Sequence, residues 1–278
     1  MREALTRVLR SYGMARGETA AGLLSLTKTA PKTDCDFDPD AWDRGEQRLL
    51  AASGIGRVVL SRLPAMGATK LPVSDGTAPL WRAVIDLPQD TSKEALGALH
   101  ALGVRGVRFD LDTPGRDSLD PLLTFADRIV PFGWHVEIKL GATGAARALA
   151  KAEWRLMQFP LAVCFSGVGN HRQERHAEAF EFVLSMMQLG RYWLKLSGDD
   201  LAQPQLKLWD EPPPLARALQ AVRKDRLIWG SGKRPDGDGT YLASSLAMLE
   251  KCVPNPGDRE LVLTDNPTTL YGFDNGNG

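Results

Sequence analysis

Eight short runs of β-branched, leucine and aromatic residues alternate along the chain with segments of helical periodicity. Alternation of this kind is typical of a parallel sheet whose strands are connected by covering helices. The pattern predicts an α/β fold, a single (β/α)₈ TIM barrel. The predicted strands are 33–37, 57–61, 80–86, 104–111, 134–140, 161–165, 191–196 and 227–229. The predicted helices are one that contains 49–52 and ends before Gly54, and 92–102, 118–129, 145–152, 177–189, 215–223 and 240–251.

The length of 278 residues suits one such barrel. The alternative is a doubly wound open sheet, which would normally carry a glycine-rich phosphate turn after its first strand. No such turn follows residues 33–37. We therefore expect one barrel domain over residues 31–278.

Residues 1–30 are predicted to form an N-terminal helix and arm outside the barrel. Leu5, Val8, Leu9 and Tyr12 recur there at helical spacing. We expect this segment to pack on the barrel or on a partner subunit, in a homo- or hetero-oligomer.

Composition argues against several classes of partner. Lys plus Arg and Asp plus Glu each number 34, so no net charge attracts nucleic acid or an anionic membrane. No apolar run approaches the roughly 18 residues that a membrane span requires. Cys35, Cys164 and Cys252 have no metal-ligand spacing and are typical of reduced thiols, which predicts a cytoplasmic protein.

Three cations lie at positions predicted to face the interior near the carboxyl ends of strands: Arg108, Lys139 and Lys195. Alternate residues of a barrel strand point inward, and the last of them face the mouth where active sites form. One interpretation is a basic cluster that binds an anionic ligand. The other is an interior salt-bridge network with Asp36, Asp110 and Glu137.

Five stretches carry motifs: LGVRGVRFD (102–110), GWHVEIKL (133–140), YWLKLSG (192–198), RLIWGSG (226–232) and DNPTTLYGF (265–273). In order and spacing they resemble the amidohydrolase-2 family, in the branch of 2-pyrone-4,6-dicarboxylate lactonases and related barrel hydrolases. The resemblance spans residues 31–273. It implies a barrel of amidohydrolase type.

The chain departs from the usual family motifs at four places. Asp36-Phe37-Asp38 stands where the family usually has His-x-His after the first strand. The strand-six motif Asp-His-Met-Gly corresponds to residues 166–169, so Gly167 replaces its histidine. In the strand-eight motif Gly232 replaces an acidic residue, and the family's arginine after strand seven is lost near Leu201.

These departures bear directly on catalysis. Hydrolysis needs a base for the attacking water, and a metal-dependent relative needs several His and Asp ligands. Because Gly167 and Gly232 supply neither, we expect no metal and no cofactor. We expect Asp36 and Asp38 to act as a replacement acid/base pair. The alternatives are a weak cation site and ion pairs with basic neighbours.

The first hypothesis is therefore a metal-independent hydrolase acting on a lactone or another small carboxylated cyclic molecule. The resemblance implies that Arg108 binds a carboxylate, while Lys139 and Lys195 would stabilise developing negative charge. Lys195 as a nucleophile is an alternative, and Asp236 or Asp238 would be another source of the missing acid. Further substrate contacts are assigned to His135, Ser166, Ser231 and Lys233, although His135 also suits a structural role.

The second hypothesis is a catalytically inactive pseudoenzyme that keeps the barrel as a ligand-binding or partner-stabilising module. A third is a lyase or isomerase that uses Lys and Asp. The second and third hypotheses both follow from the four departures from the family motifs, because barrels host unrelated chemistries.

Overall fold

The described part of the chain in this computed structural model comprises nine stretches. They are residues 24–27, 57–64, 80–111, 118–140, 145–168, 174–197, 223–230, 246–247 and 249–273.

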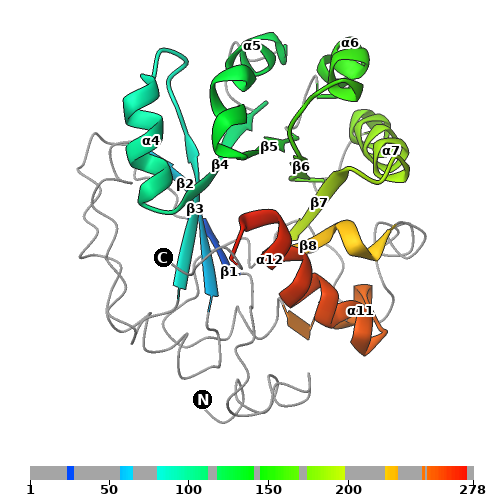
Figure 1. The fold of residues 1–278 in the computed structure, drawn as a ribbon. Coiled ribbons are helices and arrows are strands. Elements are labelled where there is room, and N and C mark those ends of the chain that lie inside the picture. The colour runs from blue at the N-terminus through cyan, green and yellow to red at the C-terminus, as the bar shows by residue number, and fades with distance from the viewer. Residues whose placement is uncertain are drawn as a thin grey trace.

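Eight parallel strands form one sheet in the order of the sequence, from β1 to β8. The sheet curls so that β1 and β8 contact each other, and Figure 1 shows α4, α5, α6 and α7 arranged around it. The predicted alternation of strands and helices is thus confirmed from β3 to β7. Residues 215–222 and 240–245, which belong to two further predicted helices, lie outside the described residues. The strands are β1 (Leu24–Thr27), β2 (Arg57–Pro64), β3 (Leu80–Asp86), β4 (Val104–Asp110), β5 (His135–Lys139), β6 (Val163–Ser166), β7 (Tyr192–Ser197) and β8 (Leu227–Gly230).

The first strand differs from the prediction. β1 occupies 24–27, inside the stretch assigned to the N-terminal arm, and pairs in parallel with β2. Residues 33–37, predicted as the first strand, lie outside the described residues. Apart from β1, residues 1–30 also lie outside them, so the rest of the proposed arm stays a prediction.

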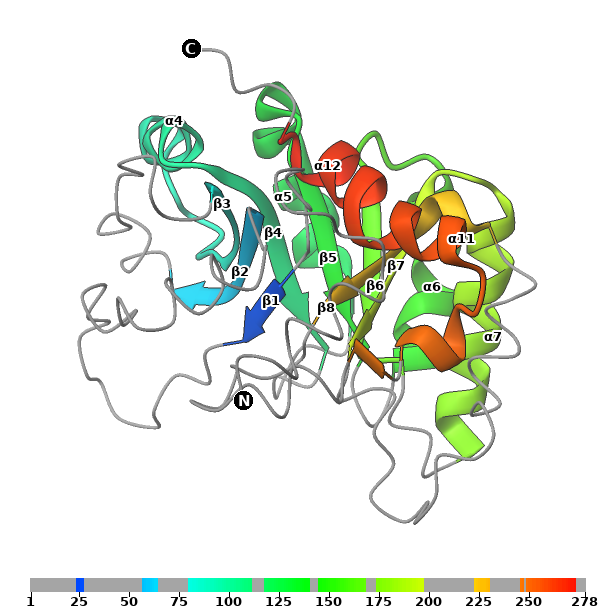
Figure 2. The same ribbon diagram turned by 90° about the horizontal axis from the view of Figure 1, so that it is seen from below.

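Helices α4, α5, α6 and α7 lie on the outer side of the curled sheet (Figure 2). α4 begins after Ser92, whose hydroxyl accepts a hydrogen bond from the Ala95 amide, a normal N-cap. α6 continues to Met157, beyond the predicted end at 152, because Leu156 continues its buried stripe. None of the described helices is long and apolar enough to cross a membrane. The bounds are α4 (Lys93–Ala101), α5 (Asp120–Ile129), α6 (Ala145–Met157), α7 (Glu174–Gln188), α11 (Pro256–Glu260) and α12 (Asn266–Tyr271), with short turns η2 (Val130–Phe132), η3 (Lys224–Arg226) and the π-helical η4 (Leu261–Asp265).

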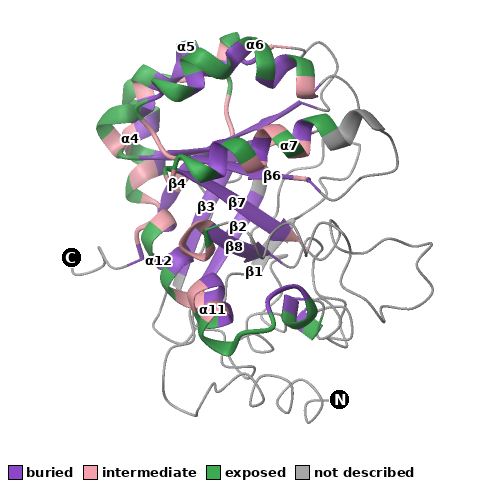
Figure 3. Ribbon diagram, turned by 90° about the vertical axis from the view of Figure 1, so that its right-hand side faces the viewer, coloured by how far each residue is buried: buried purple, intermediate pink, exposed green. Residues whose placement is uncertain are grey.

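Apolar side chains form two separate clusters. The larger cluster lies between the sheet and its helices, and Figure 3 shows the strands buried while the helices expose their outer faces. The smaller cluster includes Val59, Val84, Cys164, Trp193 and Ile228 from five strands, together with residues of the C-terminal segment. The register pairs Cys164 with both Glu137 and Trp193, so these residues face the same side of the sheet. The smaller cluster therefore fills the inside of the curl. Cys164 and Cys252 are buried free thiols, as predicted for these two residues, and Cys35 lies outside the described residues.

The C-terminal segment covers the amino-terminal ends of the strands. Tyr271 packs edge-on against His135, the first residue of β5, with ring centroids 5.0 Å apart. The guanidinium groups of Arg57 and Arg82 lie 5.5 and 5.1 Å from the Phe273 ring. Because the strands are parallel, their carboxyl ends lie together at the opposite edge of the sheet.

Candidate active site

A polar layer lies inside the curled sheet toward the carboxyl ends of the strands. Arg108 and Glu137 are paired neighbours on β4 and β5. Ser166 on β6 and Lys195 on β7 complete the layer, and all four residues are buried. Four consecutive strands thus direct one polar side chain each to a common point.

Glu137 is the centre of this layer. Its Oε2 accepts a hydrogen bond from Lys195 Nζ at 2.6 Å. Its Oε1 accepts from Arg108 Nη1 at 3.2 Å and from Ser166 Oγ at 2.9 Å. Burial would raise the pKa of Glu137, but the charges and hydrogen bonds of these partners lower it to about 2. Glu137 is therefore a fully buried carboxylate that stays charged.

A second carboxylate, Asp110, lies nearer the strand ends. Its Oδ2 is 3.1 Å from Lys139 Nζ and 3.5 Å from Arg108 Nη2. The Lys139 side chain is 24% exposed, compared with 4% for Arg108 and 5% for Lys195. Lys139 is thus the most accessible cation of this group. Among the described residues this network contains three cations, Arg108, Lys139 and Lys195, and two carboxylates, Asp110 and Glu137.

The structure brings together four of the predicted site residues: Arg108, Lys139, Ser166 and Lys195. Of the two interpretations of the cations, the contacts with Asp110 and Glu137 are those of the interior salt-bridge network. The other predicted site residues Asp36, Asp38, Ser231 and Lys233 lie outside the described residues, as do Asp236 and Asp238.

His135 does not join the network. It begins β5, at the end of the sheet that the C-terminal segment covers, and its ring lies across Gly106. A Cβ on Gly106 would come within 2.4 Å of the imidazole, so this contact requires glycine. Burial lowers the pKa of His135 to about 4, and the nearby Glu137 carboxylate only partly offsets this effect.

Lowering the pH from 7.5 toward 4 is expected to destabilise the protein through His135. The unfolded chain takes up a proton near pH 6.5, whereas the folded ring does so only near pH 4. Stability is therefore full above about pH 6.5 and falls by about 3 kcal/mol as the pH drops to 4. Urea unfolding across this pH range measures the loss of stability, and the stability of the His135→Leu variant should depend less on pH. If the stability of the variant depends on pH as strongly as that of the wild type, His135 is not the group responsible.

Gly167, directly after β6, has a φ of 74°, in the left-handed region that favours glycine. A Cβ at this position would lie 2.9 Å from the Leu140 carbonyl oxygen and 3.1 Å from Lys139 Cγ. This backbone therefore leaves no room for the histidine that the family motif has here.

The described residues do not fit a hydrolytic metal centre. Both oxygens of Glu137 already accept hydrogen bonds, and Asp110 is paired with Lys139. Throughout the described stretches, no group of three or more His, Cys, Asp or Glu side chains is positioned to hold a metal ion. We assign none of these residues to a metal.

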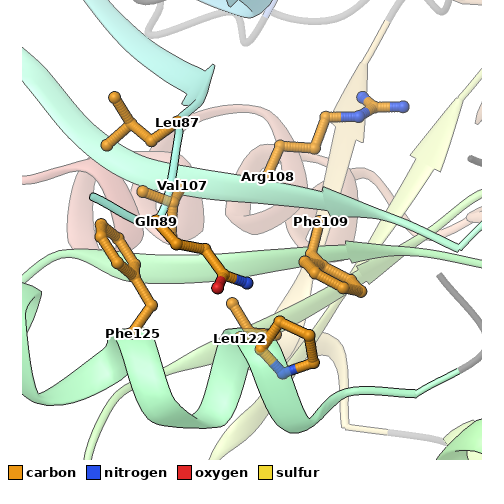
Figure 4. Close-up of a pocket in the computed structure, with 8 residues that line it drawn as sticks. Leu87, Gln89, Val107, Arg108, Phe109, Leu122 and Phe125 are labelled. Carbon is orange, nitrogen blue, oxygen red and sulfur yellow. The ribbon is translucent and has the colours of Figure 1, made fainter. Parts of the chain in front are cut away.

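A small cavity lies on the opposite side of β4, against α5. Its volume is about 30 Å³, and its lining includes Val107, Phe109, Leu122 and Phe125. Figure 4 shows the Arg108 side chain pointing away from this cavity, across the strand. Space for about one water is too little for a ligand. The candidate site is therefore the polar layer.

Comparisons with known proteins agree with the motifs. The amidohydrolase family model Amidohydro_2 matches residues 17–273. The chain is 26% identical over 249 residues to a 4-sulfomuconolactone hydrolase from Hydrogenophaga intermedia, covering 84% of this chain and 80% of that protein. It is 26% identical over 212 residues to a 2-pyrone-4,6-dicarboxylate hydrolase from Comamonas testosteroni, covering 68% and 66%.

A solved structure shares the fold. The crystal structure of a Pseudomonas putida protein described as a 2-pyrone-4,6-dicarboxylic acid hydrolase matches with a TM-score of 0.65 and 22% identity. The match covers 92% of this chain and 99% of that one. The family model extends over most of the sequence and confirms the resemblance found in the five motif stretches. The chain therefore belongs to the Amidohydro_2 family of amidohydrolases.

Proposed function

We propose that this protein is a hydrolase that opens the ring of a small lactone bearing carboxylate or similar anionic groups. Two relatives are named for such substrates, 4-sulfomuconolactone and 2-pyrone-4,6-dicarboxylate, and both names describe an anionic lactone. We further infer that the sheet and helices form a (β/α)₈ barrel of amidohydrolase type, with the substrate at the carboxyl ends of the strands.

The observation that carries this proposal is the convergence of Arg108, Lys139 and Lys195 inside the curled sheet, together with the exposure of Lys139. A cation at the edge of a low-dielectric interior attracts an anionic group more strongly than one in water does. Of the three cations Arg108, Lys139 and Lys195, Lys139 is the one with the most access to solvent. In the proposed reaction the ammonium group of Lys139 binds a carboxylate of the substrate or stabilises the oxyanion. Arg108 and Lys195, which are more deeply buried, add to the positive electrostatic potential at this position.

The base for the attacking water comes from outside this network. A carboxylate with a pKa of about 2 that accepts three hydrogen bonds, as Glu137 does, is too weak a base. Asp110 is held by Lys139 and Arg108. We propose that Asp36 or Asp38 takes the water proton. The water oxygen then adds to the lactone carbonyl, and the ring C–O bond breaks as the ring oxygen leaves.

A second candidate is a catalytically inactive barrel that binds the same anionic molecules. The observation that favours it is Gly167, whose backbone excludes a side chain at the position where the family has a histidine. Such a protein would keep the cationic layer and its ligand while lacking turnover. For both candidates we propose a small carboxylated molecule as the ligand, no cofactor, and contact of the N-terminal arm that precedes β1 with a partner subunit.

The test is ring opening by the purified protein, followed by absorbance. The panel contains 2-pyrone-4,6-dicarboxylate, 4-sulfomuconolactone, and two uncharged controls, 2-pyrone and δ-valerolactone, each with and without EDTA. We expect turnover of the anionic lactones alone, unchanged by EDTA. Inhibition by EDTA would show that a metal takes part. No turnover of any compound, combined with binding of the anionic ones, would favour the inactive barrel.

A further inference from the structure

Lys139 and Gly167 meet at the ends of neighbouring strands. Lys139 is the last residue of β5, and its backbone pairs with Ser166, which ends β6. The Leu140 amide donates to the Ser166 carbonyl at 2.8 Å, so the two strands stay paired up to Gly167. The position of the Lys139 side chain is therefore coupled to the residue that follows β6.

The space beside Gly167 is occupied by the Leu140 backbone and by the stem of Lys139. A Cβ at 167 would lie 3.1 Å from Lys139 Cγ, closer than packed side chains normally approach. From this contact the side chain extends to Asp110 on β4, where Nζ lies 3.1 Å from Oδ2. The stem is thus in contact with one neighbouring strand end and the amino group with the other.

We propose that Gly167 is a positioning residue that lets the Lys139 stem lie across the end of β6, so that its ammonium group binds the anionic group of the substrate. The inference rests on the proposed function for the identity of the ligand. The contact between Gly167 and Lys139 does not depend on it. A side chain at 167 would displace the stem, move Nζ away from Asp110 and change the charge that an incoming anion meets.

Gly167→Ala tests the proposal, and Gly133→Ala is its matched control. Gly133 also has a left-handed backbone, with a φ of 62°, but a Cβ there meets nothing within 4 Å. Both variants carry the strain of an alanine in this region. Only Gly167→Ala adds close contacts, with the Leu140 carbonyl oxygen and with Lys139 Cγ. The labelling of Lys139 and the Lys139→Met variant below separate the second contact from the first.

Two measurements report on Lys139 without requiring turnover. The first is the rate at which an amine-reactive acetylating reagent labels Lys139, read by mass spectrometry. The second is calorimetric binding of 2-pyrone-4,6-dicarboxylate, with uncharged 2-pyrone as the reference ligand. We expect Gly167→Ala to label Lys139 faster and to bind the dicarboxylate about tenfold more weakly, the scale of one charge-assisted hydrogen bond. Gly133→Ala should change neither.

Lys139→Met keeps most of the stem and removes the charge, so it tests the proposal even if Gly167→Ala fails to fold. It should weaken dicarboxylate binding by about the same factor, and adding Gly167→Ala should cause no further loss. Unchanged binding by Lys139→Met, or equal effects of the two glycine variants, would overturn the proposal. If the wild-type protein binds no dicarboxylate, the proposed ligand is rejected, and the labelling rates alone decide whether Gly167 positions Lys139.

Discussion

Glu137→Ala is expected to lower the free energy of unfolding by about 3–5 kcal/mol, because it leaves buried cations without their carboxylate. Arg108 and Lys195 come from β4 and β7, and their side chains are 4% and 5% exposed, so water cannot replace the lost partner. Ser166 loses its acceptor as well. Urea unfolding at pH 7 measures the change.

Two control variants distinguish the contribution of the Glu137 charge to stability from the contribution of its packing. Glu137→Gln keeps the shape and one acceptor oxygen while removing the charge, and should lie between the alanine variant and the wild type. The double variant Glu137→Leu with Lys195→Met replaces the pair by apolar groups and should recover part of the stability. A loss below about 1 kcal/mol in Glu137→Ala would mean that the network contributes no more than a surface ion pair.

Protonation of Glu137 is expected to cause a second loss of stability in acid, in addition to that caused by His135. Because the pKa of Glu137 is lowered from 4.5 to about 2 in the folded protein, its stabilisation is present above about pH 4.5 and is lost as the pH falls toward 2. This range lies below that of His135, so the two groups are separable by pH.

Asp36→Asn combined with Asp38→Asn is expected to lower kcat/KM for ring opening by about 100-fold or more, the usual contribution of a general base. The expectation follows from the hydrogen bonds and ion pairs that Glu137 and Asp110 already make. Glu137 accepts hydrogen bonds from three side chains, and Asp110 is paired with Lys139. An amide at positions 36 and 38 cannot take the proton of the attacking water.

Asp90→Asn, at an exposed turn, is the control for the loss of a carboxylate and should retain full activity. Unfolding curves of the double variant establish that it is folded. Full activity in the double variant would move the base to Asp236 or Asp238, and the same substitution at those positions would then test them.

Most of the fold follows from local pattern. Strands such as β4 and β8 were predicted to within one residue, because runs of apolar residues bounded by glycine and charge report burial directly. α6 was predicted too short, since the exposed Trp154, 69% accessible, interrupts the apparent division into polar and apolar faces. β1 was misplaced because its four residues, LSLT, carry too little periodicity to stand out.

For the site, the sequence by itself determined which residue types face the interior. Period-two alternation puts Glu137 and Lys139 on one face of their strand, and the motifs identified the family and its missing histidines. Only the tertiary structure decided which charges pair. Glu137 meets Lys195, which is 58 residues away, because the curl of the sheet brings β5 and β7 together and strand register sets the height of each side chain. Register and curvature are properties of the whole sheet, and a single strand does not encode them.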